Sequence, residues 1–235
     1  NRKYQSCTGD VVDSPEMKRI ESIDVDPDIR RARTLPGWVY TDPETLEEQR
    51  DRVFARAWQC VGHDSVVRAP GQVHPFSLPP GVLGEPLLLT RDQDGHVHCV
   101  SNVCTHRGTL VCEAPGTVPA LRCRYHGRRF ALDGRFLSMP GFDGAEEFPS
   151  ETDNLRSVPL ASWRTLLFAS LAPSGGLAEL VGDMDARSAF MPIERAVPHP
   201  ARSRDYEVRA NWALYCENYL EGLHIPFVHP ELARA

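Results

Sequence analysis

The sequence predicts an α+β chain in which an antiparallel all-β domain is followed by the start of an α+β domain. Two observations predict the β domain. Between residues 59 and 172 the apolar residues come in short or alternating runs, and turn pairs such as Asp94-Gly95 and Asp133-Gly134 separate these runs. That spacing is typical of strands joined by hairpins. The mixture of helix-like and strand-like segments after residue 173 predicts the α+β part.

The expected elements follow one another along the chain. Residues 1–40 are polar with scattered prolines and predict an N-terminal arm. Thr41, Asp42 and Pro43 form a helix-start pattern that predicts a leading helix over 41–58. The β domain is expected over 59–172, with strands at 59–62, 71–77, 87–90, 96–101, 130–131 and 165–170. After a linker at 173–176 we expect a helix over 177–189, a strand over 204–210 and a helix over 211–223.

Composition excludes several classes of protein. A net charge of −6 and a pI near 5.9 argue against a nucleic-acid binder, which usually carries a basic surface. No apolar run approaches the roughly 18 residues of a membrane span, and the first residues lack the pattern of a secretion signal. Seven cysteines, an odd number, fit reduced thiols and ligands better than a disulfide scaffold. We therefore expect a cytoplasmic protein that binds neither nucleic acid nor membrane.

Two short pairs of metal-binding residues stand in the β domain: Cys104-x-His106 and Cys123-x-x-His126, with sixteen residues between them. Structural zinc is the most common use of a Cys/His cluster. Zinc modules, however, usually begin with a Cys-x-x-Cys pair, whereas each pair here offers one sulfur and one nitrogen. Two such loops fit a [2Fe-2S] cluster in which one iron takes both thiolates and the other takes both imidazoles.

The segment resembles the Rieske motif at every ligand position, including the His-Arg-Gly and Tyr-His-Gly that contain the two histidines. Respiratory Rieske proteins carry two further cysteines that form a disulfide, and Thr109 and Tyr125 replace them here. Arg128 replaces a serine that would donate to the cluster, and many Rieske oxygenases carry Trp there. Fewer donors predict a lower reduction potential, as in the oxygenase and ferredoxin branch. The other cysteines are expected to be bystanders or core residues: Cys7, Cys60, Cys99, Cys112 and Cys216.

A second group of candidate ligands lies in the stretch NWALYCENYLEGLHIPFVH, which contains Glu221, His224 and His229. Residues i and i+3 share a helix face, so Glu221 and His224 are expected to point the same way. Pro226 is expected to end the helix and let His229 turn back toward them. Two histidines and a carboxylate would supply a ferrous site with open positions for dioxygen. The alternative is a helix with two ordinary histidines and a solvated acid.

Together with the first motif, this stretch resembles the mononuclear-iron motif of Rieske non-haem iron oxygenases, from about Tyr40 onward. The resemblance implies a Rieske domain over 59–172 and the beginning of a helix-grip-like catalytic domain over 173–235. It implies that His224 and His229 bind iron and that Glu221 is the bridging acid, catalytic in electron transfer and not itself a ligand. The family's third ligand is a distant carboxylate, and Glu231 is too near to be it. We therefore expect the chain to be a fragment of a longer protein.

The resemblance also implies a function. The chain would be the oxygenase component of a mono- or dioxygenase, with a [2Fe-2S] cluster, mononuclear Fe(II) and O2 as co-substrate. A flavin/iron-sulfur reductase or ferredoxin would supply electrons, so NAD(P)H would act only indirectly. The enzyme would hydroxylate or oxidatively demethylate a small organic substrate. It would assemble as a homotrimer or a multiple of it. Glu at position 221 resembles members that act on quaternary ammonium compounds. Two alternatives stay open: a Rieske ferredoxin without oxygenase chemistry, and a zinc-stabilised binding module.

Overall fold

The computed structural model describes residues 23–79, 81–142 and 144–234. The chain forms two compact units, one of residues Arg50–Ser203 and one of Asn1–Gln49 with Arg204–Ala235. These units divide the chain at other points than the predicted domains, because residues up to Ser203 pack with the β-rich unit. Cys7 and residues 1–22 of the predicted arm lie outside the described residues.

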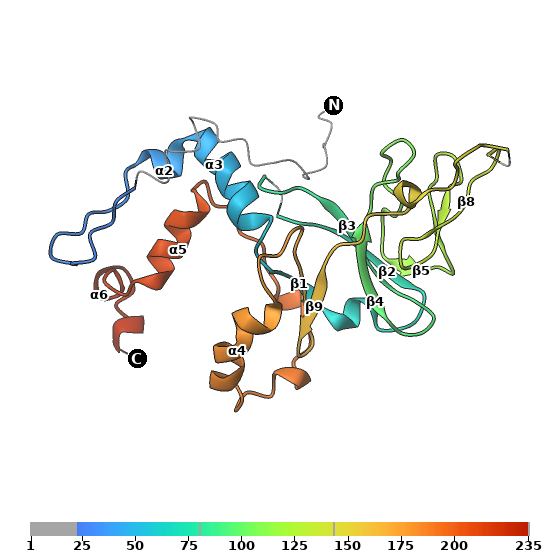
Figure 1. Ribbon diagram of the computed structural model, residues 1–235. Helices are drawn as coiled ribbons and strands as arrows, with labels where there is room; N and C mark the ends of the chain where they lie inside the picture. The colour runs from blue at the N-terminus through green and yellow to red at the C-terminus, as the bar shows by residue number, and fades with distance from the viewer. Residues whose placement is uncertain (1–22, 80, 143, 235) are drawn as a thin grey trace. The chain divides into compact units, whose positions relative to one another are not determined.

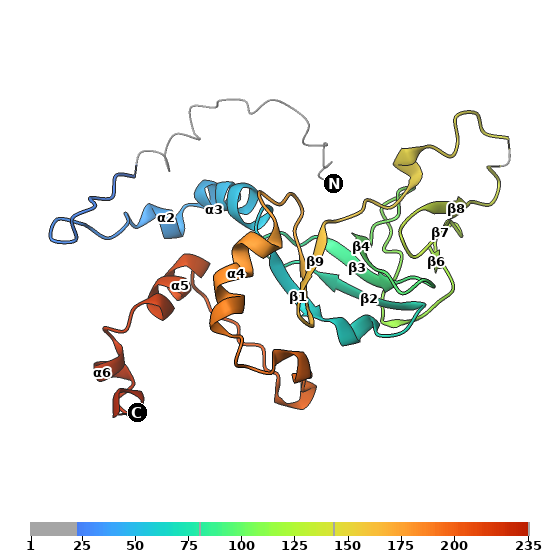
Figure 2. The same cartoon turned by 60° about the horizontal axis from the view of Figure 1, so that its bottom comes forward.

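Antiparallel strands in three sheets form the β-rich unit (Figure 1). The sheets have the strand orders β1-β10-β9, β4-β3-β2-β5 and β6-β7-β8, and Figure 2 shows the third as a small separate sheet beside the second. This arrangement confirms the antiparallel prediction. The strands are β1 (Gln59–His63), β2 (Gln72–Ser77), β3 (Pro86–Arg91), β4 (Val97–Ser101), β5 (Gly116–Thr117), β6 (Leu121–Arg122), β7 (Arg129–Phe130), β8 (Phe136–Ser138), β9 (Leu160–Trp163) and β10 (Leu166–Ala169).

Strand β3 separates two hydrophobic cores, because successive side chains of a strand point to opposite faces. Leu88 packs into one core, while Leu87 and Leu89 pack into the other, and all three are fully buried. Each such side chain contributes about 1.5–3 kcal/mol when it leaves water. The first core contains the sulfur atoms of two candidate ligands, Cys104 and Cys123. Its buried members are Val73, Leu88, Val100, Cys104, Val111, Leu121, Cys123, Phe130, Leu132 and Leu155.

Helix α4 (Leu177–Arg187) follows the β domain, close to the predicted 177–189, and packs against β9. The turn between β9 and β10 holds it in place. Arg164, at φ +54, donates from Nε to Asp185 Oδ1 at 3.1 Å and from Nη1 to the carbonyl of Met191 at 3.1 Å. Trp163 Nε1 donates to the same carboxylate oxygen at 2.8 Å. These bonds attach residues 177–191 to the first sheet.

The other unit is helical, with α2 (Trp38–Thr41), α3 (Pro43–Gln49), α5 (Trp212–Leu220) and α6 (Ile225–Val228). Helix α3 begins at Pro43, within the predicted helix start, and the carboxylate of Asp42 accepts the hydroxyl of Thr45 at 2.9 Å. A π-helical turn (Arg50–Phe54) follows α3, so the leading helix ends before Trp58. Trp212 Nε1 donates to Gln49 Oε1 at 2.8 Å and ties α5 to α3.

The strand expected over 204–210 was wrong. These residues are exposed, and none of the described strands pairs with them. A strand needs a hydrogen-bonded neighbour to satisfy its backbone, and the local apolar pattern does not reveal whether a neighbour exists. Among the helices that the structure describes, none has both the length and the apolar character of a membrane span.

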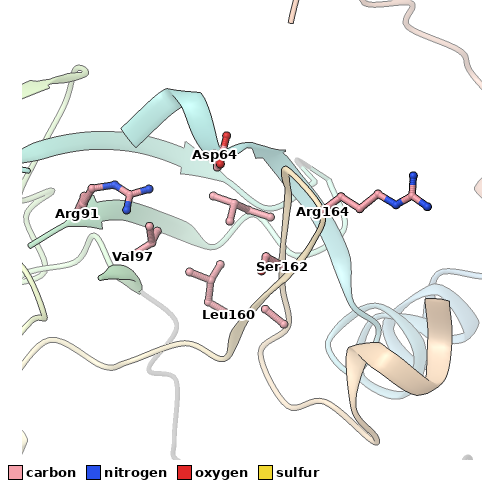
Figure 3. Close-up of a pocket in the computed structure, with 8 residues that line it drawn as sticks. Asp64, Arg91, Val97, Leu160, Ser162 and Arg164 are labelled. Atoms are coloured by element: carbon pink, nitrogen blue, oxygen red, sulfur yellow. The ribbon is translucent and has the colours of Figure 1, made fainter. Parts of the chain in front are cut away.

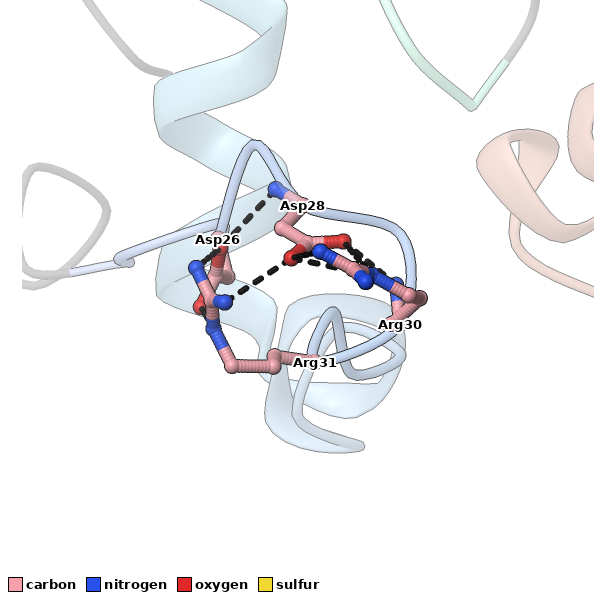
Figure 4. Close-up of polar contacts among 4 residues, drawn as sticks. All are labelled: Asp26, Asp28, Arg30 and Arg31. Carbon is pink, nitrogen blue, oxygen red and sulfur yellow. Dashed lines mark hydrogen bonds and ion pairs between the residues drawn. The ribbon is translucent and has the colours of Figure 1, made fainter.

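Ion pairs shape the described part of the predicted arm. Arg31 Nε lies 2.8 Å from Asp26 Oδ2, and Arg30 Nη2 lies 2.8 Å from Asp28 Oδ2 (Figure 4). Bonds from Arg31 and Arg30 hold the pKa values of Asp26 and Asp28 below their ordinary range. Because these pairs are solvated, each adds little to stability, and they serve to fold the turn locally.

Candidate metal centres

Two loops with the same hydrogen-bond pattern carry the four Cys/His residues of the β domain. In the first, the backbone N–H of Cys104 donates to the carbonyl of Thr109 and the N–H of Gly108 donates to the carbonyl of Cys104, both at 2.9 Å. Gly108 has φ +70, which favours glycine because a Cβ is strained there. In the second loop the corresponding bonds run from Cys123 to the carbonyl of Arg128 (2.9 Å) and from Gly127, at φ +73, to the carbonyl of Cys123 (3.1 Å).

The structure brings the four predicted cluster ligands together. Cys104 and Cys123 are 3% and 2% exposed and lie in the first core. The imidazole rings of His106 and His126 lie 4.8 Å apart between centroids, on the more exposed side of the loops. Two buried sulfurs and two outer nitrogens match the donor set of a [2Fe-2S] cluster with one Cys₂ iron and one His₂ iron.

Burial disfavours the charged form of the Cys104 sulfur unless a cation lies beside it. Burial raises the pKa of the Cys104 thiol, and the neighbouring Cys123 thiol adds to this rise. Neither cysteine is in a disulfide. Two thiolates in one buried place repel each other, so a cationic metal centre is needed to stabilise both in the ligating form. The buried pair therefore fits a metal centre.

Aromatic rings flank the two histidines. Tyr125 stacks on His126 with ring centroids 3.8 Å apart, and Phe142 lies 6.1 Å from His106. Burial lowers the pKa of His106, and the positive charges of His126 and Arg107 lower it further. Neutral imidazole is the form that binds metal, so the surroundings of His106 favour ligation.

Of the other cysteines, Cys99 is a core residue, as expected. It is 2% exposed, and burial raises its pKa to about 12. Cys112 is half-buried and donates from Sγ to the carbonyl of Ala114 at 3.1 Å. Cys60 and Cys216 are exposed and belong to neither Cys/His loop.

The second candidate site is built by a turn rather than by a helix face. Helix α5 ends at Leu220, so Glu221 caps it in extended conformation (φ −111, ψ 154) and does not lie on its surface. The expectation that Glu221 and His224 share a helix face was therefore wrong. Glu221 Oε2 accepts the backbone N–H of Leu223, and this local bond replaces a further helical turn.

The turn nevertheless brings the predicted residues together. Glu221 Oε1 lies 2.5 Å from His224 Nδ1, and the rings of His224 and His229 lie 5.4 Å apart. The two histidines stand at the N-cap and C-cap of the short helix α6. Pro226 lies in the first turn of α6, where proline is well tolerated, so it begins a helix instead of ending one.

This arrangement fits a mononuclear metal in part. Because the Glu221 carboxylate contacts Nδ1 of His224, the Nε2 atom is left to bind a metal, a common arrangement of metal-bound histidine. The bond with His224 lowers the pKa of Glu221. Within the described part of the chain, no carboxylate forms a three-ligand group with His224 and His229.

A group of side chains at the turn between β3 and β4 also has metal-ligand chemistry. Ligand atoms of Asp92, Asp94 and His96 lie within 4.8 Å of one another. The hydrogen bonds of Asp92 explain why these side chains lie together, because they stabilise the turn. Its Oδ1 accepts the backbone N–H of Asp94 and of His96, and its Oδ2 lies 2.7 Å from His98 Nε2. The last contact is the main reason why the pKa of Asp92 falls to about 2.

A cavity of about 290 Å³ lies between the first two sheets (Figure 3). Both arginines that line it form hydrogen bonds within the fold. Arg91 donates to the carbonyls of Val67 and Gly95, and the guanidinium of Arg164 points away from the cavity toward Asp185. Neither arginine is therefore free to bind a charged ligand in the cavity.

Two family models match the parts of the chain that carry the two candidate sites. Residues 57–149 match the Rieske [2Fe-2S] domain, and residues 195–235 match the catalytic domain of the ring hydroxylating alpha subunit. The chain therefore contains a Rieske domain and part of a ring-hydroxylating catalytic domain. The [2Fe-2S] cluster and the mononuclear iron are the cofactors of these two domains.

The relatives of this chain include enzymes named for quaternary ammonium compounds. It is 30% identical to chloroplastic choline monooxygenase of Amaranthus tricolor over 224 residues, which cover 92% of this chain and 49% of the relative. It is 27% identical to the carnitine monooxygenase oxygenase subunit of Acinetobacter baumannii, covering 92% and 58%. The chain thus spans about half the length of these relatives.

Solved structures show the same fold. A quaternary ammonium Rieske monooxygenase, CntA, in complex with an inhibitor superimposes with a TM-score of 0.75 at 25% identity, covering 86% of this chain and 56% of that one. Naphthalene 1,2-dioxygenase from Rhodococcus sp. gives 0.69 at 26% identity, covering 86% and 47%.

Sequence reasoning missed two residues beside the cluster site. Thr105 and Asp153 bond to each other, hydroxyl to backbone carbonyl at 2.8 Å, although 48 positions separate them. No local pattern signals such a contact.

Proposed function

We propose that this chain is part of an oxygenase that passes electrons from a [2Fe-2S] cluster to a ferrous iron, where dioxygen reacts with an organic substrate. The observation that carries this proposal is the convergence of Cys104, His106, Cys123 and His126, with sulfurs buried and imidazoles outermost. A ferredoxin needs only this site. The contact of Glu221 with His224, next to His229, favours the oxygenase.

The chain's own residues would have the following roles. Cys104 and Cys123 would bind one iron of the cluster, and His106 and His126 the other. His224 and His229 would bind the mononuclear iron. When bound, the cluster carries single electrons and the ferrous iron activates dioxygen.

Glu221 would orient His224 through Nδ1 and form the last step of the electron path. In the family this acid contacts a cluster histidine of a neighbouring subunit. We therefore propose a homotrimer or a multiple of it. Inter-subunit electron transfer is described for a quaternary ammonium Rieske monooxygenase whose fold this chain shares.

We propose that a reductase or ferredoxin delivers the electrons. A groove of about 600 Å³ borders the second loop at Gly127 and is lined in part by Arg122 and Arg129, both exposed. Such a surface next to the cluster suits an electron donor with an acidic face, since complementary charge speeds association. The unpaired thiols among the described cysteines support a reducing compartment such as the cytoplasm.

We propose a quaternary ammonium compound as the substrate. Support comes from Glu at position 221 and from relatives named choline, glycine betaine and carnitine monooxygenase. The test is dioxygen consumption by the full-length protein, coupled to its reductase, with choline, glycine betaine, carnitine or an aromatic acid. Uptake that depends on one of the amines supports the proposal.

Metal content separates the alternatives in the same preparations. A ferredoxin should hold two irons per chain, and the full-length oxygenase should hold three. Two irons per chain without substrate-dependent dioxygen uptake would indicate a ferredoxin. Bound zinc without acid-labile sulfide would indicate a zinc-stabilised binding module.

A further inference from the structure

An arginine is buried at the end of the second cluster loop. Arg128 is only 3% exposed, and its guanidinium forms an ion pair with the carboxylate of Asp153. Its Nη2 also lies 3.5 Å from the backbone carbonyl of Asp153. Arginine is almost never fully buried unless it is paired, and removal of one partner of a buried pair leaves a costly uncompensated charge. The pair is therefore tightly constrained.

Three phenylalanine rings surround this guanidinium. The Cζ atom of Arg128 lies 4.9 Å from the ring centroid of Phe136, 5.6 Å from that of Phe148 and 5.8 Å from that of Phe130. Rings at these distances attract a cation and exclude water. The Nε atom of Arg128 is buried without a hydrogen-bond partner among the described residues. The charge thus lies in an apolar pocket, where its field is weakly screened.

Asp153 contacts both cluster loops at once. Its backbone carbonyl accepts the hydroxyl of Thr105, from the first loop, at 2.8 Å, and its carboxylate binds Arg128, from the second. Asp153 is itself fixed by the backbone N–H of Ser150, which donates to Oδ2 at 2.7 Å. Burial raises the pKa of Asp153, but the bonds from Ser150 and Arg128 outweigh it and hold the pKa below its ordinary value. One residue outside the two loops therefore holds them to each other.

We propose that Arg128 and Asp153 form a positioning pair that fixes the two cluster loops and sets the reduction potential of the cluster. The inference rests on the proposed function, because it needs a cluster between the loops. Reduction adds a negative charge to the cluster, so the guanidinium stabilises the reduced state and the carboxylate opposes it. The absence of a serine donor at position 128 lowers the reduction potential, and the positive charge of the buried arginine raises it.

Opposite shifts of the potential are the signature of this pair. Arg128→Met removes the positive charge and is expected to lower the potential of the iron- and sulfide-loaded chain. Asp153→Asn leaves the arginine uncompensated and is expected to raise it. Arg128→Lys keeps the charge but not the planar fork, so it should keep a potential near the parental value while losing acid-labile sulfide faster.

A matched control lies in the same loop. Arg124 pairs with Glu113 at 3.2 Å, but its side chain is 79% exposed. Arg124→Met should therefore leave the potential and the sulfide content at the parental values, since solvent screens this charge.

The measurement is a potentiometric titration followed by paramagnetic resonance, with sulfide analysis of each variant. Shifts of Arg128→Met and Asp153→Asn to opposite sides of the parental value support the proposal. Shifts in the same direction, or none, would overturn it and leave a purely structural pair. If Arg128→Met does not fold, Asp153→Asn and Arg128→Lys decide, since a potential at or below the parental value in Asp153→Asn contradicts the proposal. A parental protein that holds no sulfide would overturn the proposed function as well.

Discussion

Replacement of the loop glycines by alanine tests how the backbone forms the cluster site. A Cβ at Gly108 would meet nothing within 4 Å, and a Cβ at Gly127 would meet Pro140 Cγ at 3.5 Å, an ordinary contact. The cost is therefore conformational, because both residues have positive φ. A left-handed conformation costs alanine about 1–2 kcal/mol, and the lower entropy of the unfolded chain offsets about 0.4–1 kcal/mol. We expect each variant to lose about 1 kcal/mol of unfolding free energy.

Gly134→Ala is the steric comparison for this prediction. Gly134 also has positive φ, but its Cβ would lie 3.0 Å from Val100 Cγ1 and 3.2 Å from the carbonyl of Leu155. Overpacking adds about 1–3 kcal/mol. Urea unfolding of the metal-free variants measures the differences, and Gly108→Asn should cost less than Gly108→Ala because Asn adopts this conformation more easily. Equal losses in Gly108→Ala and Gly134→Ala would refute the reasoning.

Three further predictions concern charge. Glu221→Gln should leave both metals bound but slow reoxidation of the reduced cluster by roughly ten- to a hundredfold, the usual effect of changing a group that orients a metal ligand; an unchanged single-turnover rate would exclude the bridging role. Asp92→Asn should cost about 1–2 kcal/mol of unfolding free energy at pH 7. This difference should shrink as the pH falls from about 4 to about 2, because the folded-state pKa of Asp92 is about 2 and the parental carboxyl is then protonated in both states; a difference that stays constant with pH would contradict it. Arg122→Glu with Arg129→Glu should slow reduction of the cluster by its reductase most at low salt, and a salt-independent effect in stopped-flow measurements would argue against the docking groove.

The β domain could be predicted because its signals are local. The pairs Asp94-Gly95 and Asp133-Gly134 lie in turns whose glycines have φ +89 and +91. Alternating apolar residues placed most of the long strands. Strand β9 (Leu160–Trp163) was missed, because a four-residue run without a turn pair at its start has no distinctive pattern.

The site was predicted in its residue types but only partly in its geometry. The spacing of the Cys/His pairs was enough to single them out. Each pair lies in a short loop closed by its own backbone hydrogen bonds, so its geometry depends on neighbouring residues in the sequence. The contact between Glu221 and His224 was predicted for the wrong reason, because a side-chain bond to the backbone of Leu223 competes with the helix. The Arg128–Asp153 pair spans 25 positions and depends on the packed fold, which no local pattern encodes.

The central claim is that Cys104, His106, Cys123 and His126 hold a [2Fe-2S] cluster. Its most direct test is the paramagnetic resonance spectrum of the chemically reduced protein, recorded beside His126→Cys. We expect a Rieske-type signal in the parent. In the variant, the iron held by two histidines would instead take His106 and the new cysteine, so the signal should change or be lost. A parent that gives no signal on reduction and binds zinc instead would contradict the account.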